Sequence, residues 1–536
     1  MGYICTTADK LQHYVASLTE QHAIESQMEK RLIDNLNAEI SLGTVTTIDE
    51  AVQWLGYTYL YIRMRREPHI YGIDRKSLAD DPFLGQKRRD LVTVAAKKLH
   101  DLQMIVFDPR TGNLMSKDLG RIASNFYIYH TSVEMINRLM TPSMEIKQVL
   151  HMLSECSEFS NIKSRGSFPP LSFSNELESE VPTLKEFNEK FSYPVVGGTA
   201  TTPGKVNLLM QAHFQNLHIN DTGLAMDMRF VAENARRLAA ALFQVALSRE
   251  FSPTALTILR IRIALERQLD PESHPLTDPR LGLPREIAYK IEYLGARADI
   301  DEMMEMDNNE LGDLVHHHRM GERIARALDN LPHVTMDVQT APLTRKVLRV
   351  NITVTPSFTW YDRIHEATEP FWIWVEDSNS IRILYSQYIV LTKKKMGDPI
   401  EINCTIPLTD PLPAQIFVRA VSDRWIGVDN YIPVSFQHLI LPDMNTPETR
   451  LLNLRPLSVS ALQNDVLEAV YGAKFGYFNP LQTQVFHVMY HTNQNVLLGA
   501  PTGSGKTVAA ELAMWYVPFS SLLTVGVYSI LVLMPK

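Results

Sequence analysis

One stretch of the sequence has the residue types and the spacing that phosphate binding needs. It reads GAPTGSGKT from Gly499 to Thr507, between the apolar run 496–498 and the helix-forming run 508–513. Glycines allow successive backbone N–H groups to surround a phosphate, and a helix that begins at the end of the loop adds its partial positive charge. The order of strand, glycine loop, lysine, hydroxyl and helix therefore predicts a nucleotide-binding loop, with ATP and Mg²⁺ as its ligands.

The expected nucleotide contacts come from the loop and from one residue upstream of it. Lys506 is expected to reach the β- and γ-phosphates, and the Thr507 hydroxyl is expected to hold Mg²⁺. Gln482 lies on a helix that begins with proline, and a side-chain amide can form two hydrogen bonds with adenine. Ala500 departs from the pattern, which normally begins with glycine. The predicted nucleotide-binding residues are Gln482, Ala500, Pro501, Thr502, Gly503, Ser504, Gly505, Lys506 and Thr507.

These motifs resemble a known family. The string FNPLQTQVFHVMYHTNQNVLLGAPTGSGKTVAAELA, residues 478–513, is similar to the Q-motif and motif I of superfamily two DEAD/DEAH-box helicases with two helicase cassettes. The resemblance implies ATP-dependent 3′–5′ unwinding of nucleic acid, as in DNA repair and ribosome quality control. It also implies single-stranded DNA or RNA and other subunits of a cointegrator-type complex as partners, and a location in the nucleus and cytosol.

ATP hydrolysis needs groups beyond the loop. A carboxylate must hold the metal and polarise water, and an arginine must stabilise the transferring phosphate. No D-E-x-H string follows the loop, and no arginine motif of this family is present. The loop also lies at the end of the sequence, where a helicase should begin. We therefore expect a fragment with the tail of one cassette and the nucleotide pocket of the next, which binds nucleotide weakly and does not unwind alone.

Length and composition limit the alternatives. A chain of 536 residues should hold several domains, and a net charge of −8 restricts nucleic-acid contact to local basic faces. The three cysteines, Cys5, Cys156 and Cys404, match no metal spacing and suit a reducing compartment. The uncharged stretch 515–534 is long enough for a membrane span, but Pro518 interrupts it. A buried parallel strand near 529–533 is predicted instead, and no membrane is expected.

A helix predicted over 230–249 is the main candidate for strand binding. Its apolar stripe consists of Val231, Leu238, Leu242 and Val245. Asn234 and Arg237 lie on another face, one helical turn apart. In the helicase family the matching helix is a ratchet along which the single strand moves, so the resemblance implies that Asn234 and Arg237 face that strand. Arg236 points about 100° away and is expected to matter less.

The remaining segments suggest positioning domains. The Thr47–Glu50 capping box, helical spacing through Val52, Leu55, Tyr59 and Ile62, and a turn at 108–113 predict a small helical domain with a two-stranded wing. The strings 35–45 and 50–68 resemble the winged-helix domain of these helicases. Its basic clusters at 63–66 and 87–89 can contact phosphates or form solvated helix faces. A helical hairpin is expected to turn at Met320-Gly321. The adjacent His316–His318 run is not expected to bind metal, because consecutive helical residues diverge.

From residue 334 the sequence alternates with period two. The runs 348–354 and 371–376 predict strands of an immunoglobulin or fibronectin type III β-sandwich. Residues 119–137, LGRIASNFYIYHTSVEMIN, resemble the opening of a unit shared with the J-domain subunit of the Sec translocon. The expected class is multidomain α+β, in this order: end of a RecA-like lobe and linker 1–20, winged helix 21–117, helical bundle 118–283, helix-hairpin-helix 284–333, β-sandwich 334–441, linker 442–477, and the start of a RecA-like ATP-binding domain 478–536.

Two other functions remain open from the sequence. The winged-helix, helical, hairpin and sandwich domains alone can form a non-catalytic scaffold that binds nucleic acid or protein. The unit shared with the Sec translocon and the apolar tail also allow a translocon component in a membrane, although the sequence has no J-domain and no convincing span.

Overall fold

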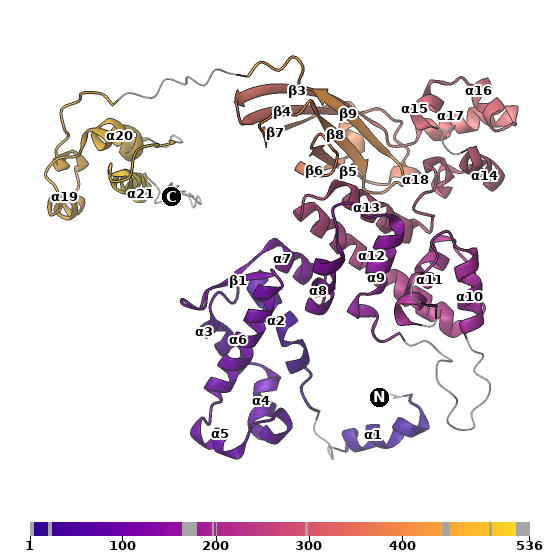
Figure 1. Cartoon of the computed structure of the whole chain (residues 1–536), viewed down its shortest axis with the longest axis horizontal. Helices are drawn as coiled ribbons and strands as arrows, with labels where there is room; N and C mark the ends of the chain where they lie inside the picture. The colour runs from indigo at the N-terminus through magenta and orange to yellow at the C-terminus, as the bar shows by residue number, and fades with distance from the viewer. Residues whose placement is uncertain are drawn as a thin grey trace. The chain divides into compact units, whose positions relative to one another are not determined.

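A computed structural model describes residues 5–19, 24–162, 180–195, 198–199, 201–294, 299–441, 451–492 and 496–520 (Figure 1). The chain divides into two compact units, Met1–Pro442 (unit 1) and Asp443–Lys536 (unit 2). Helical domains are followed in the chain by two packed antiparallel sheets, which confirms the multidomain α+β class. Among the described residues, no helix is long and apolar enough to cross a membrane. The strand predicted near 529–533 lies outside the described residues.

The first domain of unit 1 is the predicted winged helix. Its two-stranded wing pairs Ile105 with Ser116 and Phe107 with Leu114. The single helix expected through Val52 and Ile62 is wrong, because the chain turns at Tyr57 and Thr58 caps a new helix by accepting from the Tyr61 N–H. The helix α1 (Ala8–Leu18) precedes this domain in the chain, and its own elements are α2 (Leu32–Leu42), α3 (Ile48–Gly56), α4 (Tyr59–Arg66), α5 (Arg75–Asp80), α6 (Gly85–Asp101), β1 (Ile105–Phe107) and β2 (Leu114–Ser116).

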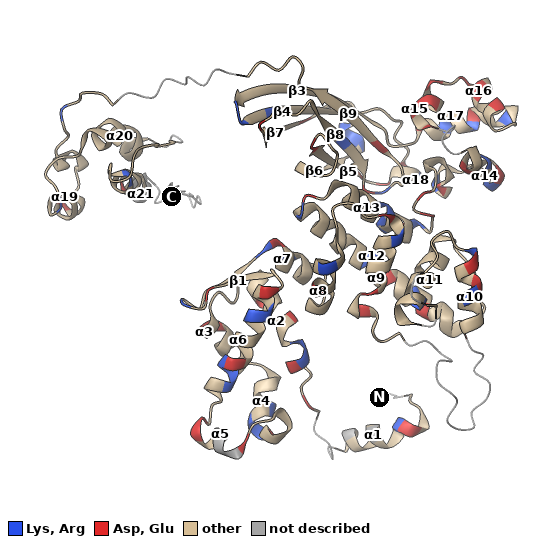
Figure 2. Ribbon diagram, in the orientation of Figure 1, with Lys and Arg blue, Asp and Glu red and all other residues tan. Residues whose placement is uncertain are grey.

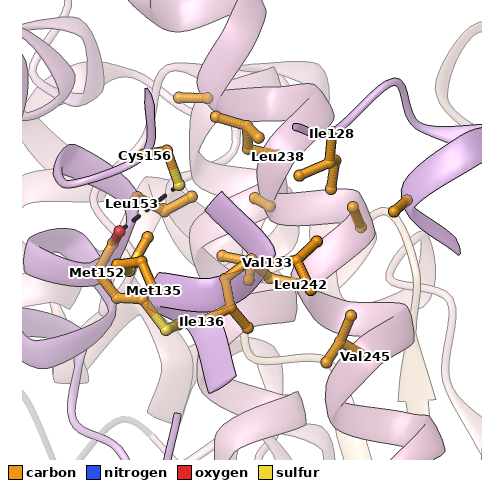
Figure 3. Packing of buried hydrophobic residues seen from close by; sticks show 14 of the residues in the cluster. Ile128, Val133, Met135, Ile136, Met152, Leu153, Cys156, Leu238, Leu242 and Val245 are labelled. Carbon is orange, nitrogen blue, oxygen red and sulfur yellow. Dashed lines mark hydrogen bonds between the residues drawn. The ribbon is translucent and has the colours of Figure 1, made fainter. Parts of the chain in front are cut away.

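The helical bundle follows, with the long helix α12 at its centre. The four apolar residues predicted on this helix are all buried, and Leu238, Leu242 and Val245 pack in one cluster with Ile128 and Met152 (Figure 3). The helices are α7 (Asp118–Asn125), α8 (His130–Leu139), α9 (Ile146–Ser154), α10 (Val181–Lys190), α11 (Thr202–Phe214), α12 (Thr222–Ser248) and α13 (Ser252–Arg267). The core therefore fixes which face of α12 is turned away from the bundle.

A buried ion cluster joins three of these helices. Lys205 on α11 is fully buried, and its Nζ donates to both carboxylate oxygens of Glu180 and to Asp227 Oδ2, each at 2.8 Å. Glu180 precedes α10 and Asp227 lies on α12. Burying these charges is tolerated because they are paired and hydrogen-bonded. The cluster therefore ties the start of α10 to α11 and α12.

The helical hairpin turns earlier than predicted. Gly321 has helical dihedral angles and begins the second helix, while the turn occupies 315–320 and includes His316 at φ +52°. Gly321 is needed for close packing, because a Cβ there would lie 1.7 Å from the Asn308 carbonyl oxygen. The helices are α14 (Arg285–Leu294), α15 (Ile300–Glu305), α16 (Asn308–Leu314) and α17 (Gly321–Asp329).

The predicted β-sandwich is present. One sheet has the order β3-β4-β7 and the other β6-β5-β8-β9, and all neighbours are antiparallel. The alternating residues Leu348, Val350, Ile352 and Val354 form one side of the core. The strands are β3 (Val334–Thr344), β4 (Val347–Pro356), β5 (Glu369–Glu376), β6 (Ile383–Leu391), β7 (Ile400–Pro407), β8 (Gln415–Ser422) and β9 (Asp429–Ser435); the short α18 spans Asp362–His365.

Strand β5 is buried on both faces. Phe371, Ile373 and Val375 point into the sandwich, whereas Trp374 belongs to the core of the helical bundle. Glu376 at the end of β5 is fully buried and accepts from Ser252 Oγ (2.6 Å) at the start of α13. Trp374 is completely buried, and the half-buried Trp372 packs its ring against Phe243 of α12.

A second buried carboxyl makes the stability of unit 1 depend on pH. Glu369 is fully buried, and its oxygens lie 3.3 and 3.4 Å from Trp425 Nε1 and 3.9 Å from Arg424 Nη1. Burial raises the pKa of Glu369 from 4.5 to about 7, although the Arg424 charge opposes this rise. Between these pKa values the folded protein binds a proton that the unfolded chain releases, so the contribution of Glu369 to stability is greatest below pH 4.5 and is lost as pH rises through 7.

Glu369→Gln should remove this dependence. We compare the free energy of unfolding of the variant with that of the parent at each pH. From pH 5 to pH 8, the variant should gain about 2–3 kcal/mol relative to the parent. Urea denaturation at a series of pH values measures it. Glu366→Gln is the matched control, since that carboxylate also contacts Arg424 (3.0 Å) but is 66% exposed. Parallel pH profiles of Glu369→Gln and parent would contradict the prediction.

Unit 2 has its own aromatic core around Tyr471, Phe478 and Phe486. The sequence predicts a linker over 442–477, but its described part, 451–477, instead folds into unit 2 and buries Leu467 and Tyr471. The strand expected before the glycine loop is also absent, because 496–498 form no ladder with any described residue and Leu497 is 93% exposed. A parallel strand requires paired neighbours. The helices are α19 (Asp465–Gly472), α20 (Pro480–His491) and α21 (Lys506–Ser520).

Candidate nucleotide and nucleic-acid binding sites

The glycine loop of unit 2 closes around its lysine. Lys506 is the first residue of α21, and its Nζ donates to the Ala500 carbonyl at 2.5 Å and to the Pro501 carbonyl at 2.7 Å. Gly503 and Gly505 have φ values of +84° and +87°, which favour glycine strongly. The ammonium group therefore lies inside a loop whose backbone is bent as a phosphate cradle requires.

The start of α20 holds this loop from one side. Asn479 and Gln482 form a capping box in which each side chain accepts from the other residue's backbone N–H, at 2.8 and 3.0 Å. The spare N–H groups then reach the loop: Asn479 Nδ2 donates to the Ser504 carbonyl (2.9 Å) and Gln482 Nε2 to the Gly505 carbonyl (3.3 Å). Gln482 is only 5% exposed, and its predicted contact with adenine stays a prediction.

The aromatic core of unit 2 places α21 behind the loop. The Tyr471 hydroxyl of α19 donates to Glu511 Oε2 of α21 at 2.8 Å and accepts from Trp515 Nε1 at 3.1 Å. Burial, followed by the bond to Glu511, raises the pKa of Tyr471 to about 12, so the phenol stays protonated as a donor. The helix that carries Lys506 is thus fixed by polar as well as apolar contacts.

The residues present fit a nucleotide with its magnesium ion. Apart from Gly503 and its two chain neighbours, no heavy atom of the described residues lies within 4 Å of the position that a Cβ would take at Gly503, so the loop is open there. Gly505 is the opposite case, because a Cβ there would lie 2.3 Å from Gln482 Nε2. Thr507 is exposed in the first turn of α21 and can present its hydroxyl to a metal ion. Lys506, the loop amides and Thr507 are the groups that would hold Mg·ATP.

In unit 1, α12 brings Asn234 and Arg237 together as predicted. Arg237 Nη2 donates to Asn234 Oδ1 at 2.9 Å, and both side chains are partly exposed. Arg237 Nη1 also donates to the carbonyls of Phe126 and Tyr127, each at 2.6 Å. Sequence reasoning missed this contact, because no local pattern links residues more than a hundred positions apart. Arg236 is exposed, as its offset on the helix predicts.

The basic clusters of the winged helix are largely occupied within the protein. Arg63 is buried and pairs with Glu25 through two hydrogen bonds (2.5 and 3.1 Å). Arg88 donates to the Val52 carbonyl at 2.9 Å, and Arg89 pairs with Asp49. Along α6 the basic residues stand in two groups, 87–89 and 97–98, with acidic residues at 90 and 101 (Figure 2). The cluster 87–89 lies inside α6, in the first turns of the helix.

The structure offers no metal-binding cluster among the residues it describes. His318 contacts Asp313 at 2.7 Å and the two neighbouring histidines are exposed. Asn479 is the residue of the nucleotide site that sequence reasoning missed, as it was given no role. Its signal was available, because Asn followed three residues later by Gln is a capping-box spacing.

Comparison with known proteins identifies the family. Residues 116–435 match the Sec63 Brl domain, residues 25–101 a Winged Helix-turn-helix domain and residues 479–536 the DEAD/DEAH box helicase family. Since the first match spans more than half of the chain, the protein belongs to the Sec63 Brl domain family.

Full-length relatives are similar over nearly the whole chain. Identity is 42% over 516 residues to the RQC trigger complex helicase SLH1 of Saccharomyces cerevisiae and 42% over 519 residues to activating signal cointegrator 1 complex subunit 3 of Gallus gallus. It is 39% over 513 residues to the U5 small nuclear ribonucleoprotein 200 kDa helicase of Homo sapiens. Each alignment covers 96% of this chain, which spans 25%, 23% and 23% of these relatives. The resemblance to two-cassette helicases is confirmed.

Proposed function

We propose that this chain is part of an ATP-dependent helicase that unwinds nucleic acid in the 3′–5′ direction, with a strand-binding helix in unit 1 and a nucleotide-binding loop in unit 2. The observation that carries the proposal is the glycine loop closed around Lys506 and held by the Asn479–Gln482 capping box. Two of the relatives support it, since both are named as helicases. A nuclear and cytosolic location and partners in a cointegrator-type complex belong to the same proposal.

Three residues of the nucleotide site have distinct roles in this proposal. ATP supplies the free energy for movement along the strand. Lys506 exchanges its bonds to the Ala500 and Pro501 carbonyls for phosphate oxygens, and this exchange keeps the ammonium group hydrogen-bonded throughout. Thr507 orients the metal ion, and Gln482 links the base-binding side of the site to the loop through the Gly505 carbonyl.

Binding measurements test the proposal. Calorimetry with Mg·ATP and fluorescence anisotropy with a labelled single-stranded oligonucleotide should both show binding, and steady-state assays should show no turnover, because the sequence has no D-E-x-H string. Strand binding without nucleotide binding would favour the scaffold alternative. Flotation with lipid vesicles would favour the translocon alternative. A chain that bound neither nucleotide nor strand would refute the helicase proposal.

Arg237→Ala should weaken single-strand binding. The expected loss is about 1–3 kcal/mol if the guanidinium stacks on a base, and the salt slope should fall by about one unit if it contacts only phosphate. Arg236→Ala, one position away on the same helix, is the matched control and should have the smaller effect. Anisotropy at matched salt measures both. Stability must be checked in parallel, because Arg237 also holds the 126–127 carbonyls. If both variants bind the strand with the affinity of the parent, α12 does not bind the strand.

A further inference from the structure

We propose that Tyr127 is a stacking platform for a nucleobase of single-stranded nucleic acid, at one end of the α12 stripe that contains Arg237. The inference rests on the proposed function, since it adds a base contact to the same strand-binding surface. It concerns a residue outside α12, in the loop between α7 and α8.

The loop presents Tyr127 to solvent while its neighbours are fixed. Tyr127 is 80% exposed, whereas Ile128 is buried in the bundle core together with Leu238 of α12 (Figure 3). Phe126 packs against the same core, and Tyr129 is held by Arg31, whose Nη1 donates to its hydroxyl at 2.6 Å. Only one aromatic side chain of this short loop is therefore turned outward, and the backbone on both sides of it is anchored.

The backbone at Tyr127 is held in an uncommon conformation by the strand-binding helix itself. Its φ is +53°, in the left-handed region that bulky residues rarely adopt. Arg237 Nη1 donates to the carbonyls of both Phe126 and Tyr127 at 2.6 Å, which ties this conformation to α12. Strain of this kind persists only where surrounding contacts determine it, and it gathers at functional sites. Arg237 is thus a positioning residue for the Tyr127 ring as well as a candidate strand contact.

The surrounding side chains have the composition of a single-strand site. Phe230, Asn234 and Arg237 follow one another at i, i+4 and i+7 on α12, and Phe230 is 43% exposed. Asn234 Nδ2 donates to the Phe230 carbonyl at 3.0 Å and its Oδ1 accepts from Arg237. Arg229 and Arg236 are exposed on the adjoining stripe. Aromatic faces beside cations are the means by which proteins bind single strands with little sequence preference.

The side chains around Tyr127 indicate which ligand this surface binds. A tyrosine ring offers a flat face to any base, so the platform should accept DNA and RNA alike, while the flanking arginines attract the backbone. Tyr289 on α14 is 77% exposed and lies in another domain, the helical hairpin, so it serves as the control for removal of an exposed tyrosine ring.

The test compares two oligonucleotides of equal length and charge, one with bases throughout and one with a run of abasic sites at its centre. Anisotropy with the whole chain should show that Tyr127→Ala binds the base-containing strand about tenfold or more weakly than the parent, the loss typical of one stacked base. On the abasic strand the two proteins should bind alike. Tyr127→Phe should retain parental affinity because its ring is kept, and Tyr289→Ala should match the parent on both strands.

Three results would overturn the proposal that Tyr127 stacks on a base. An equal loss on both strands would show that Tyr127→Ala disturbs the fold or a phosphate contact and would overturn the stacking proposal. Parental binding by Tyr127→Ala together with weakened binding by Arg237→Ala would overturn it while leaving the proposed function in place. A parent chain that binds neither strand would overturn both, and a protein partner would then be the better occupant.

Discussion

Lys205→Ala should lower the free energy of unfolding of unit 1 by about 3–5 kcal/mol, the usual loss when one partner of a buried ion pair is removed. The reason is electrostatic. Glu180 and Asp227 would remain within reach of each other without the cation that bridges them, and the Glu180 side chain is only 1% exposed. Three helices, α10 to α12, meet at this cluster, so its loss should loosen the support of α12 as well.

Urea denaturation of the whole chain measures the shift in midpoint. Lys185→Ala on α10 is the matched control, because that lysine is exposed and a surface change of this kind should stay within about 0.5 kcal/mol. Lys205→Met keeps the apolar stem of the side chain and isolates the effect of the charge. If Lys205→Ala and Lys185→Ala unfold at the same urea concentration, the cluster is not buried in solution and its role here is wrong.

Lys506→Ala should reduce the affinity for Mg·ATP by about 2–5 kcal/mol, which is roughly 30-fold or more and takes weak binding below detection. The side chain is the cation closest to the loop carbonyls of Ala500 and Pro501, and no backbone amide can replace its full charge. Its removal leaves those carbonyls exposed to water, so the stability of unit 2 should change by no more than about 1 kcal/mol.

Calorimetry with Mg·ATP provides the measurement, and thermal melts of the same samples report stability. Lys474→Ala is a suitable control, since Lys474 is an exposed lysine of unit 2 that lies 5.8 Å from the Tyr471 ring rather than in the loop. Equal affinity in Lys506→Ala and parent would mean that the loop does not bind phosphate. A large loss of stability would mean that the lysine is structural.

Local patterns predicted the parts of the fold that depend on periodicity. The wing at 105–116, the apolar stripe of α12 and the alternating strands from β3 onward follow from spacings of 3.6 and 2 residues. The glycine loop could also be predicted from the sequence, because its chemistry requires particular residues in one short run. Element boundaries were less certain: Thr58 divides a helix whose apolar spacing continues across it.

Long-range pairing was not predictable from one sequence. The strand expected at 496–498 depends on neighbours elsewhere in the chain, so its apolar residues alone did not determine its conformation. The contacts of Arg237 could not be predicted for the same reason. Its position on α12 indicated that it is exposed, but not that it binds two distant carbonyls. Lys205 lies in a helix with apolar neighbours, and only the fold brings Glu180 and Asp227 to it.

The junction between α12 and the β-sandwich has a mechanical consequence. Between α12 and α13, the Glu250 carbonyl accepts from the N–H of Ile383, the first residue of β6, at 2.8 Å, and the Ser252 N–H at the start of α13 donates to the Ile381 carbonyl at 2.9 Å. Ser252 is further tied to Glu376 at the end of β5. A force applied along α12 would therefore pass into the four-stranded sheet that contains β5 and β6, rather than into a free helix end. The sandwich acts as an anchor, and α12 can resist a pull without sliding through the bundle.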